Sequence, residues 1–275
     1  MYGLIMSFQD FRLGDFPGFS EWVGLKHFRA LFNDQVFMRS IRNTLVIGAL
    51  KLLINFPLPI FFATLLNELR HKYFKKTVQT ISYLPHFISW VICAKLMQDF
   101  FSADNGAVNN VLVALGILDT PIVFFNRANW FWFIAVVTDL WKELGFNSIL
   151  FLAAIASLDQ EMYEAADVDG ATRIQKMWHI TLASIRPTIA LLFVFTAGNL
   201  LNANFDQIMM LTNQMGIATL RETADIIDTY VFRLGISNAR FSYAAASGLF
   251  KSVFNFILLL SVNKIAGKLG DSAVF

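Results

Sequence analysis

Charged and amide side chains recur inside long apolar runs of this sequence. They are Lys51, Lys95, Asp139, Lys142, Glu143, Asn147, Asn199, Asn202, Asn204, Asp206, Lys251 and Asn255. A charge in hydrocarbon costs roughly 2.5–3.5 kcal/mol on insertion scales, so such groups tend to face a protein interior or a wet cavity. Carboxylates and ammonium groups can pair with one another, and amides offer both the donor and the acceptor that a hydroxyl group needs. The pattern therefore indicates either a path for a polar solute or hydrogen bonds between packed helices.

Patterns for catalysis and nucleotide binding are absent from the sequence. It has no G-x-x-x-x-G-K-[ST] phosphate loop, so ATP has no conventional site on this chain. Cys93 is the single cysteine, which excludes an intrachain disulfide and a cysteine metal site. The histidines are scattered without metal-ligand spacing, and no basic tract alternates with aromatic residues as nucleic-acid binding would require. We expect no enzymatic activity, no cofactor and no metal on this chain.

The most organised polar stretch covers residues 159–186. Acidic residues crowd its start, where the positive end of a helix dipole favours negative charge. Gly170 ends this first helix, and Thr172 followed by Gln175 has the spacing of a capping box that starts a second helix. Apolar residues then recur at three- and four-residue spacing, at Ile174, Met177, Trp178 and Leu182. The stretch predicts two short helices around a glycine corner, protruding like a knob, with an ordinary interfacial loop as the alternative.

Elements long enough to cross a membrane must position these polar groups. The chain is 56% hydrophobic and 15% charged, with a mean hydropathy of +0.54, whereas soluble domains carry about 25% charge. A helix needs about 20 mostly apolar residues to cross the hydrocarbon layer. Backbone groups in lipid need partners within their own segment, so each span is predicted to be helical and the fold all-α. Five segments qualify, at about residues 41–66, 77–101, 129–158, 187–211 and 243–266.

The first 40 residues differ from the rest. Residues 1–11 read like the end of an apolar helix, and the amphipathic run 27–38 suits a helix lying on a membrane surface. We therefore divide the chain into an interfacial region, residues 1–40, and a five-helix transmembrane core, residues 41–275. Lysine and arginine are equally numerous in the loops assigned to the two faces, so the positive-inside rule leaves the orientation open. Only the dense basic loop 67–76 favours a cytoplasmic face.

A known motif matches the knob. Glu164-Ala165-Ala166, with Gly170 four residues later and Ile180, Leu182 and Pro187 downstream, resembles the EAA motif of permease subunits of binding-protein-dependent ABC importers. In that family the loop is cytoplasmic, and its coupling helix docks into a cleft of the ATPase subunit. One position departs from the family pattern, because Ala183 follows Leu182 where a proline is usual. The resemblance implies that the ATPase-coupling residues are Glu164, Ala165, Ala166, Asp169, Gly170 and Ala171.

The resemblance extends over nearly the whole chain. The chain is similar to the maltose-type carbohydrate permeases, and comes closest to the branch for complex oligosaccharides such as alginate or pectin fragments. The similar segments are residues 22–45, 141–147, 151–154, 205–208, 224–231 and 248–252. This implies a polytopic membrane helix bundle of the type I ABC importer permease kind in the inner membrane of a bacterium. Members of this family generally have six helices with both ends cytoplasmic, which implies that residues 1–11 are the external end of a first helix mostly absent here. The loops 67–76 and 159–186 would then be cytoplasmic, and the interfacial segment within residues 1–40 would be external.

The resemblance also implies partners and a mechanism. The chain would import oligosaccharides by alternating access, together with a second permease in a heterodimer, two ATPase subunits that hold ATP and magnesium, and an external solute-binding protein. Candidate substrate-path residues are then Asp139, Lys142, Asn147, Asn199, Asn202, Asn204, Asp206 and Lys251; hydrogen bonding between helices or to the second permease is their alternative role. An ion-coupled secondary transporter would also explain charges in the spans, but such carriers often contain related halves and no internal repeat is evident here.

Overall fold

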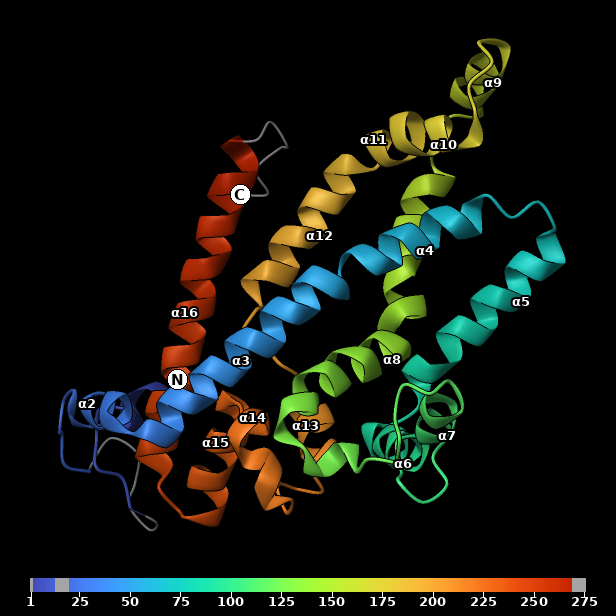
Figure 1. The fold of residues 1–275 in the computed structure, drawn as a ribbon. Coiled ribbons are helices and arrows are strands. Elements are labelled where there is room, and N and C mark those ends of the chain that lie inside the picture. The colour runs from blue at the N-terminus through green and yellow to red at the C-terminus, as the bar shows by residue number, and fades with distance from the viewer. Residues whose placement is uncertain (1, 13–19, 269–275) are drawn as a thin grey trace. The chain divides into compact units, whose positions relative to one another are not determined.

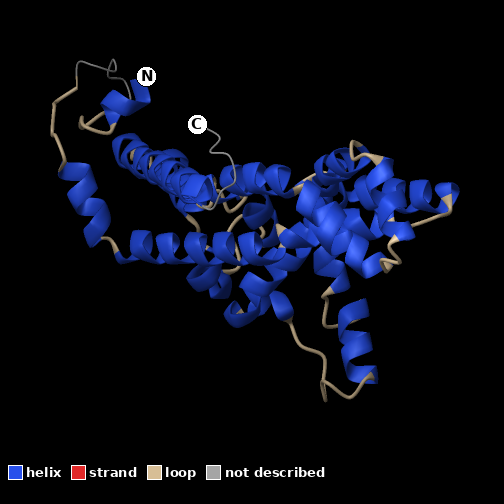
Figure 2. Cartoon of the chain, turned by 90° about the horizontal axis from the view of Figure 1, so that it is seen from above, coloured by secondary structure: helices blue, strands red, loops and turns tan. Residues whose placement is uncertain are grey.

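Helices form every regular element that the structure describes. The computed structural model describes residues 2–12 and 20–268, in which helices are joined by turns and loops (Figure 1 and Figure 2). Strand-like pairing in these residues is limited to an isolated bridge between Gln9 and Trp22. The prediction of an all-α fold is confirmed.

The helices before the central one are α1 (Tyr2–Met6), α2 (Lys26–Asn33), α3 (Gln35–Ile54), α4 (Pro57–Asn67), α5 (Lys72–Tyr83), η1 (Leu84–Phe87), α6 (Trp90–Phe100), α7 (Ala107–Ala114) and η2 (Phe124–Asn126). The central helix α8 (Ala128–Ala156) is followed by α9 (Gln160–Val168), α10 (Arg173–Lys176), η3 (Met177–Thr181), α11 (Leu182–Ser184) and α12 (Arg186–Gly198). The remaining helices are α13 (Phe205–Leu211), η4 (Ala218–Leu220), α14 (Arg221–Ala224), α15 (Ile227–Phe232), η5 (Arg233–Ser237) and α16 (Phe241–Lys268).

The chain divides into two compact units that each combine separate stretches of sequence. Unit 1 comprises Met1–Ala49, Trp90–Val136 and Leu200–Ile257, and unit 2 comprises Leu50–Ser89, Val137–Asn199 and Leu258–Phe275. The long helices α3, α8 and α16 contribute residues to both units. The division at residue 40 into an interfacial region and a transmembrane core stays a prediction.

Unit 1 has two apolar clusters, one around Phe131, Ile134 and Ile208 and the other around Phe37 and Tyr230. A fully buried amide in this unit has several hydrogen-bond partners, as burial in a low-dielectric interior requires. The fully buried Asn109 donates to the carbonyls of Phe101, Ser102 and Ile122 and accepts from the Ile122 amide at 2.9 Å. This one side chain therefore closes the loop that carries α7.

Unit 2 packs around Ile60, Ala63, Phe151, Ile155 and Ile185. Its α8 passes so close to the end of α5 that a Cβ built on Gly145 would lie 2.1 Å from the Ser82 carbonyl oxygen. A residue larger than glycine cannot fit there without moving the backbone, so Gly145 sets the approach of these two helices.

The predicted spans agree with the structure only in part. Among the described residues, two helical stretches are long and apolar enough to cross a membrane, Gln35–Asn67 and Phe241–Gly267, and a third results if α10–α11 and α12, which meet at 61°, form one span. The predicted span 129–158 is the continuous α8 but carries three charges. Two predicted spans are interrupted: 77–101 by η1 at Pro85, and 187–211 between Gly198 and Phe205. Proline removes a backbone donor and clashes with the preceding turn, which explains the first break. The number of five crossings stays a prediction.

Candidate functional site

The knob at residues 159–186 begins with a capped helix. The Asp159 side chain caps the N-terminus of α9 by accepting from the Glu161 amide at 3.0 Å, as the cluster of acidic residues suggested. The helix ends at Val168, and Gly170 follows with φ +73°, a left-handed conformation that glycine adopts at no steric cost. The predicted glycine corner is confirmed.

The second arm of the knob starts where the sequence predicted. Thr172 and Gln175 form a reciprocal capping box, in which the Thr172 amide donates to Gln175 Oε1 at 2.8 Å and the Gln175 amide donates to Thr172 Oγ1 at 3.4 Å. The arm continues through the π-turn η3 into α11. Figure 1 shows α9 at the far tip and α10 and α11 leading back to α12.

Side-chain contacts tie the two arms together. Lys176 Nζ lies 2.6 Å from Asp167 Oδ1, and the Tyr163 hydroxyl lies 2.9 Å from Thr181 Oγ1. Trp178 packs edge-to-face on Phe61 of α4 at 6.3 Å, which anchors the second arm to the body of unit 2. Cross-arm bonds of this kind make the knob a defined shape rather than a loose loop.

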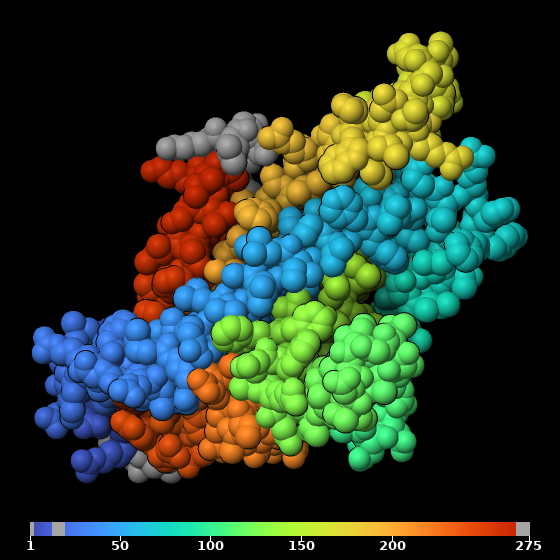
Figure 3. Space-filling model, viewed as in Figure 1, coloured from blue at the N-terminus to red at the C-terminus, as the bar shows by residue number. Residues whose placement is uncertain are grey.

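The surface of the knob combines acidic and apolar groups. Glu164, Ala165, Asp169 and Gly170 are exposed, and Ala166 and Ala171 are half-buried. Val168 is 89% exposed and Ile174 is 68% exposed. The yellow atoms at the upper right of Figure 3 show how far this segment projects. A hollow of about 330 Å³ lies between the arms, lined by Ala166, Asp169, Gly170, Ala171, Gln175, Lys176, His179 and Ile180. Exposed apolar side chains on a rigid projection suit a protein partner.

The substrate-path candidates in unit 2 bond mainly within the protein. Asp139 accepts from Lys51 Nζ at 2.8 Å and from the Asn55 amide at 2.9 Å, and the Lys51 and Asp139 side chains are only 13% and 14% exposed. Asn199 donates to the Phe195 carbonyl at 3.1 Å within its own helix, and Asn147 is exposed. These contacts favour a helix-pairing role for Asp139.

Lys142 has a structural explanation as well. Its side chain is 5% exposed, donates to the carbonyls of Pro85 and His86, and lies 3.5 Å from Glu143 Oε1. The break of the helix at Pro85 leaves carbonyls without helical partners, and a buried cation from α8 satisfies them. Glu143 in turn lies 2.6 Å from His86 Nδ1, and the His86 ring stacks on Phe146 at 3.7 Å.

In unit 1 the structure brings two of the candidates together. Asn202 and Lys251 line a pocket of about 480 Å³, with Phe205, Asp228, Val231, Phe232, Gly235, Ile236 and Ala244. Lys251 Nζ lies 2.6 Å from Asp228 Oδ1, and the rings of Phe205 and Phe232 lie 5.4 Å apart. Aromatic faces beside charged and amide groups can bind a polar ligand that also has apolar faces. Asn204 lies outside the lining; with φ +69° it caps α13 through the Gln207 amide, and Asp206 is exposed in the first turn of that helix.

Sequence reasoning missed Asp228, Phe205 and Phe232 as members of this pocket. A lysine in an apolar helix requires a counter-ion or water, which was the available signal for Asp228. Its position, 23 residues before Lys251, lies in another element, so local spacing could not identify it.

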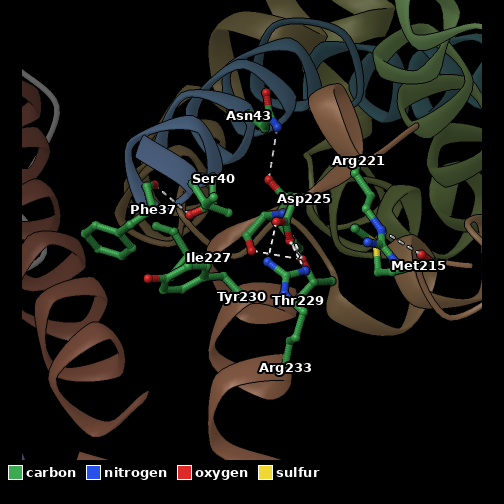
Figure 4. A network of polar contacts seen from close by, with 12 residues as sticks. Phe37, Ser40, Asn43, Met215, Arg221, Asp225, Ile227, Thr229, Tyr230 and Arg233 are labelled. Atoms are coloured by element: carbon green, nitrogen blue, oxygen red, sulfur yellow. Dashed lines mark hydrogen bonds and ion pairs between the residues drawn. The ribbon is translucent and has the colours of Figure 1, made fainter. Parts of the chain in front are cut away.

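A polar network holds the residues next to this pocket (Figure 4). Asp225, 1% exposed, accepts from Arg233 Nη2 at 2.6 Å and from the Thr229 hydroxyl at 2.8 Å, while Asn43 donates to the Asp225 carbonyl at 3.0 Å. Tyr230 donates to Asp34 at 2.6 Å. Burial, and next the bond to Asp34, raises the pKa of Tyr230, so the hydroxyl stays protonated. The network fixes α15, which supplies one wall of the pocket.

Within residues 2–12 and 20–268, no group of three or more His, Cys, Asp or Glu side chains could hold a metal ion. The knob and the pocket can both bind a partner or ligand.

Comparison with known proteins identifies relatives along the whole chain. The family described as "Binding-protein-dependent transport system inner membrane component" matches residues 55–270. Protein LplB of Bacillus subtilis is 43% identical over all of this chain and 85% of that protein. The polygalacturonan/rhamnogalacturonan transport system permease protein YteP of the same organism is 42% identical over all of this chain and 84% of that protein. A chain of a bacterial ABC transporter involved in import of the acidic polysaccharide alginate superposes with a TM-score of 0.86 at 42% identity, covering 97% of this chain and 87% of that chain.

Proposed function

This chain belongs to the inner membrane components of binding-protein-dependent transport systems, and on that premise we propose that it is the permease subunit of an ATP-driven oligosaccharide importer. The observation that carries the proposal is the protruding, internally bonded knob at residues 159–186. The chain that carries it is similar to a polygalacturonan/rhamnogalacturonan transport system permease and to a chain of an ABC transporter involved in import of alginate. The protein resides in the cytoplasmic membrane, in keeping with its family and its apolar helices.

The knob is the ATPase-coupling element in this proposal. Val168 and Ile174 supply apolar area, Glu164 and Asp169 supply charge, and Gly170 sets the angle between the arms. A docked element transmits movement only if it does not deform, and the Lys176–Asp167 and Tyr163–Thr181 contacts oppose deformation. The residues that bear on the ATPase are Glu164, Ala165, Ala166, Asp169, Gly170 and Ala171.

Energy comes from other subunits. We assign ATP and magnesium to two ATPase subunits, and the other half of the pore to a second permease in a heterodimer with this chain. An external binding protein delivers the solute, as the family description implies. For ATP to drive transport, ATP and the loaded binding protein must favour the same outward-open state, since a ligand shifts a conformational equilibrium only by its differential affinity.

The substrate class follows from the relatives and from the pocket in unit 1. We infer an acidic oligosaccharide that contacts Lys251, Asn202 and the rings of Phe205 and Phe232. Asp228 holds Lys251 in position and neutralises it while the pocket is empty, and a sugar carboxylate would compete for the ammonium group. The other candidates, Asp139, Lys142, Asn147, Asn199, Asn204 and Asp206, retain a supporting role along the path.

Reconstitution tests the proposal. The chain is purified through a tag from cells that carry its gene neighbourhood, and the recovered complex is placed in liposomes with ATP enclosed. The proposal expects a co-purified ATPase and ATP-dependent uptake of uronate oligosaccharides that requires the binding protein. Uptake by the isolated chain, driven by an ion gradient and indifferent to ATP, would overturn it in favour of a secondary transporter.

A further inference from the structure

Helix α7 presents an apolar face that no part of its own unit covers. Val111 is 55% exposed, Leu115 is 67% exposed, and Ile117 just beyond the helix is 64% exposed. The opposite face, with Val108 and Leu112, packs on the first apolar cluster of unit 1. The helix therefore has its buried side satisfied and still carries large apolar side chains on its outer side.

Charge is absent from this segment. No Asp, Glu, Lys or Arg occurs between Asp104 and Asp119, whereas both of these flanking residues are charged and exposed. Of the exposed residues on α7 and directly after it, only Asn110 has a polar side chain. A helix facing water normally carries charged residues on its outer face. The composition instead fits an environment that excludes charge.

Backbone groups at the end of α7 are already paired. Gly116, with φ +70°, closes the C-terminus: the Gly116 amide donates to the Val113 carbonyl at 3.0 Å, and the Ile117 amide donates to the Leu112 carbonyl at 3.0 Å. The Leu115 amide donates to Val111 at 3.0 Å. A segment with its carbonyls paired in this way can enter an apolar medium without a large desolvation penalty.

Other helices of the same unit also expose large apolar side chains. Phe100 at the end of α6 is 49% exposed, and Trp130 and Phe133 at the start of α8 are 40% and 54% exposed. Trp130 belongs to one of the two residue types, tryptophan and tyrosine, that are enriched at the boundary between lipid and water. Exposed apolar side chains on these helices of a membrane protein suit contact with lipid, and those of α7 have the same character.

We propose that α7 lies in the membrane–water boundary, with Val111, Leu115 and Ile117 in contact with lipid acyl chains. Asp104 and Asp119 mark the points at which the segment returns to water. The loop 102–128 is then an anchor that holds the ends of α6 and α8 at the membrane surface rather than a free loop.

Site-directed spin labelling tests this in the intact transport complex, reconstituted in liposomes of phosphatidylethanolamine and phosphatidylglycerol. The single cysteine is buried, so a Cys93→Ser background allows one label at Leu115→Cys and a matched label at Asp119→Cys in the same loop. Retained ATP-driven uptake shows that each labelled complex is folded. A label at Val111→Cys repeats the measurement on the same face of α7 as Leu115.

Collision rates with oxygen, which concentrates in lipid, and with the polar complex nickel ethylenediaminediacetate distinguish the environments. The ratio of oxygen to nickel collisions at residues 115 and 111 should exceed that at residue 119 by roughly an order of magnitude, because the polar reagent partitions poorly into hydrocarbon. A ratio equal to that at residue 119 would place α7 in water. Protection from both reagents would mean that a protein partner covers the face. Either result overturns the proposal.

Discussion

Replacement of Gly170 by valine is the sharpest perturbation of the knob. A Cβ at this position meets no atom within 4 Å, so its cost comes from the backbone conformation, in which φ is +73°. A left-handed backbone costs an L-residue roughly 1–2 kcal/mol, with the upper end expected for a β-branched side chain. If the docked knob requires this corner, the ATPase subunit should bind about 5- to 30-fold more weakly.

The assay is ATP hydrolysis by the reconstituted complex as ATPase subunit is added back, with and without the loaded binding protein. Gly170→Val should shift the half-maximal subunit concentration by that factor and reduce substrate-stimulated hydrolysis. Gly24→Val is the matched control, since Gly24 has φ +57° and open space around its Cβ but lies outside the knob. Wild-type stimulation by Gly170→Val, or an equal loss in both variants, would refute the reasoning.

Three further substitutions probe the interior. Asp139→Asn removes the carboxylate partner of Lys51 in a largely buried pair, which should cost about 3–5 kcal/mol of stability and lower the unfolding temperature in detergent. The Lys51→Met/Asp139→Leu variant should recover much of the lost stability, and no recovery would indicate another role for the pair. Gly145→Ala forces a Cβ against the Ser82 carbonyl and should lose about 1–3 kcal/mol of stability. Gly248→Ala places its Cβ in open space and should leave stability unchanged. Equal melting curves for the two variants would contradict the close approach of α8 to the end of α5. Lys251→Gln should raise KM for a uronate oligosaccharide roughly 10- to 150-fold if a charge-assisted bond worth about 1.5–3 kcal/mol is lost. Lys95 is exposed and paired with Asp99, so Lys95→Gln should leave uptake unchanged. The same KM in both variants would exclude Lys251 from the substrate path.

Local signals in the sequence predicted the knob well. A capping box depends on residues three apart, and a glycine corner depends on a single position, so Thr172, Gln175 and Gly170 could be interpreted without tertiary information. The acidic residues at the start of α9 likewise predicted a helix N-terminus there, and Asp159 caps it. The all-α fold could be predicted in the same way, because the backbone groups of an apolar segment in lipid find their hydrogen-bond partners within the segment when it is helical.

The interior of the spans could not be predicted in the same way. The partner of Asp139 is Lys51, 88 positions away, and the carbonyls that Lys142 satisfies belong to Pro85 and His86 in another helix. Hydropathy measures the composition of a segment and does not register where its helix breaks, so the interruption between Gly198 and Phe205 was missed. Polar residues in a membrane are therefore easily located from sequence, while their partners are set by packing.

Cross-linking from the tip of the knob tests the central claim most directly. In a Cys93→Ser background, a photoactivatable cysteine reagent is attached at Ala165→Cys, which is exposed, and at Asp119→Cys as the control. In the active complex, the label at residue 165 should react with the ATP-hydrolysing subunit, and the label at residue 119 should not. If a complex that still imports oligosaccharide gives no product between residue 165 and the ATPase, the account of the coupling knob is contradicted.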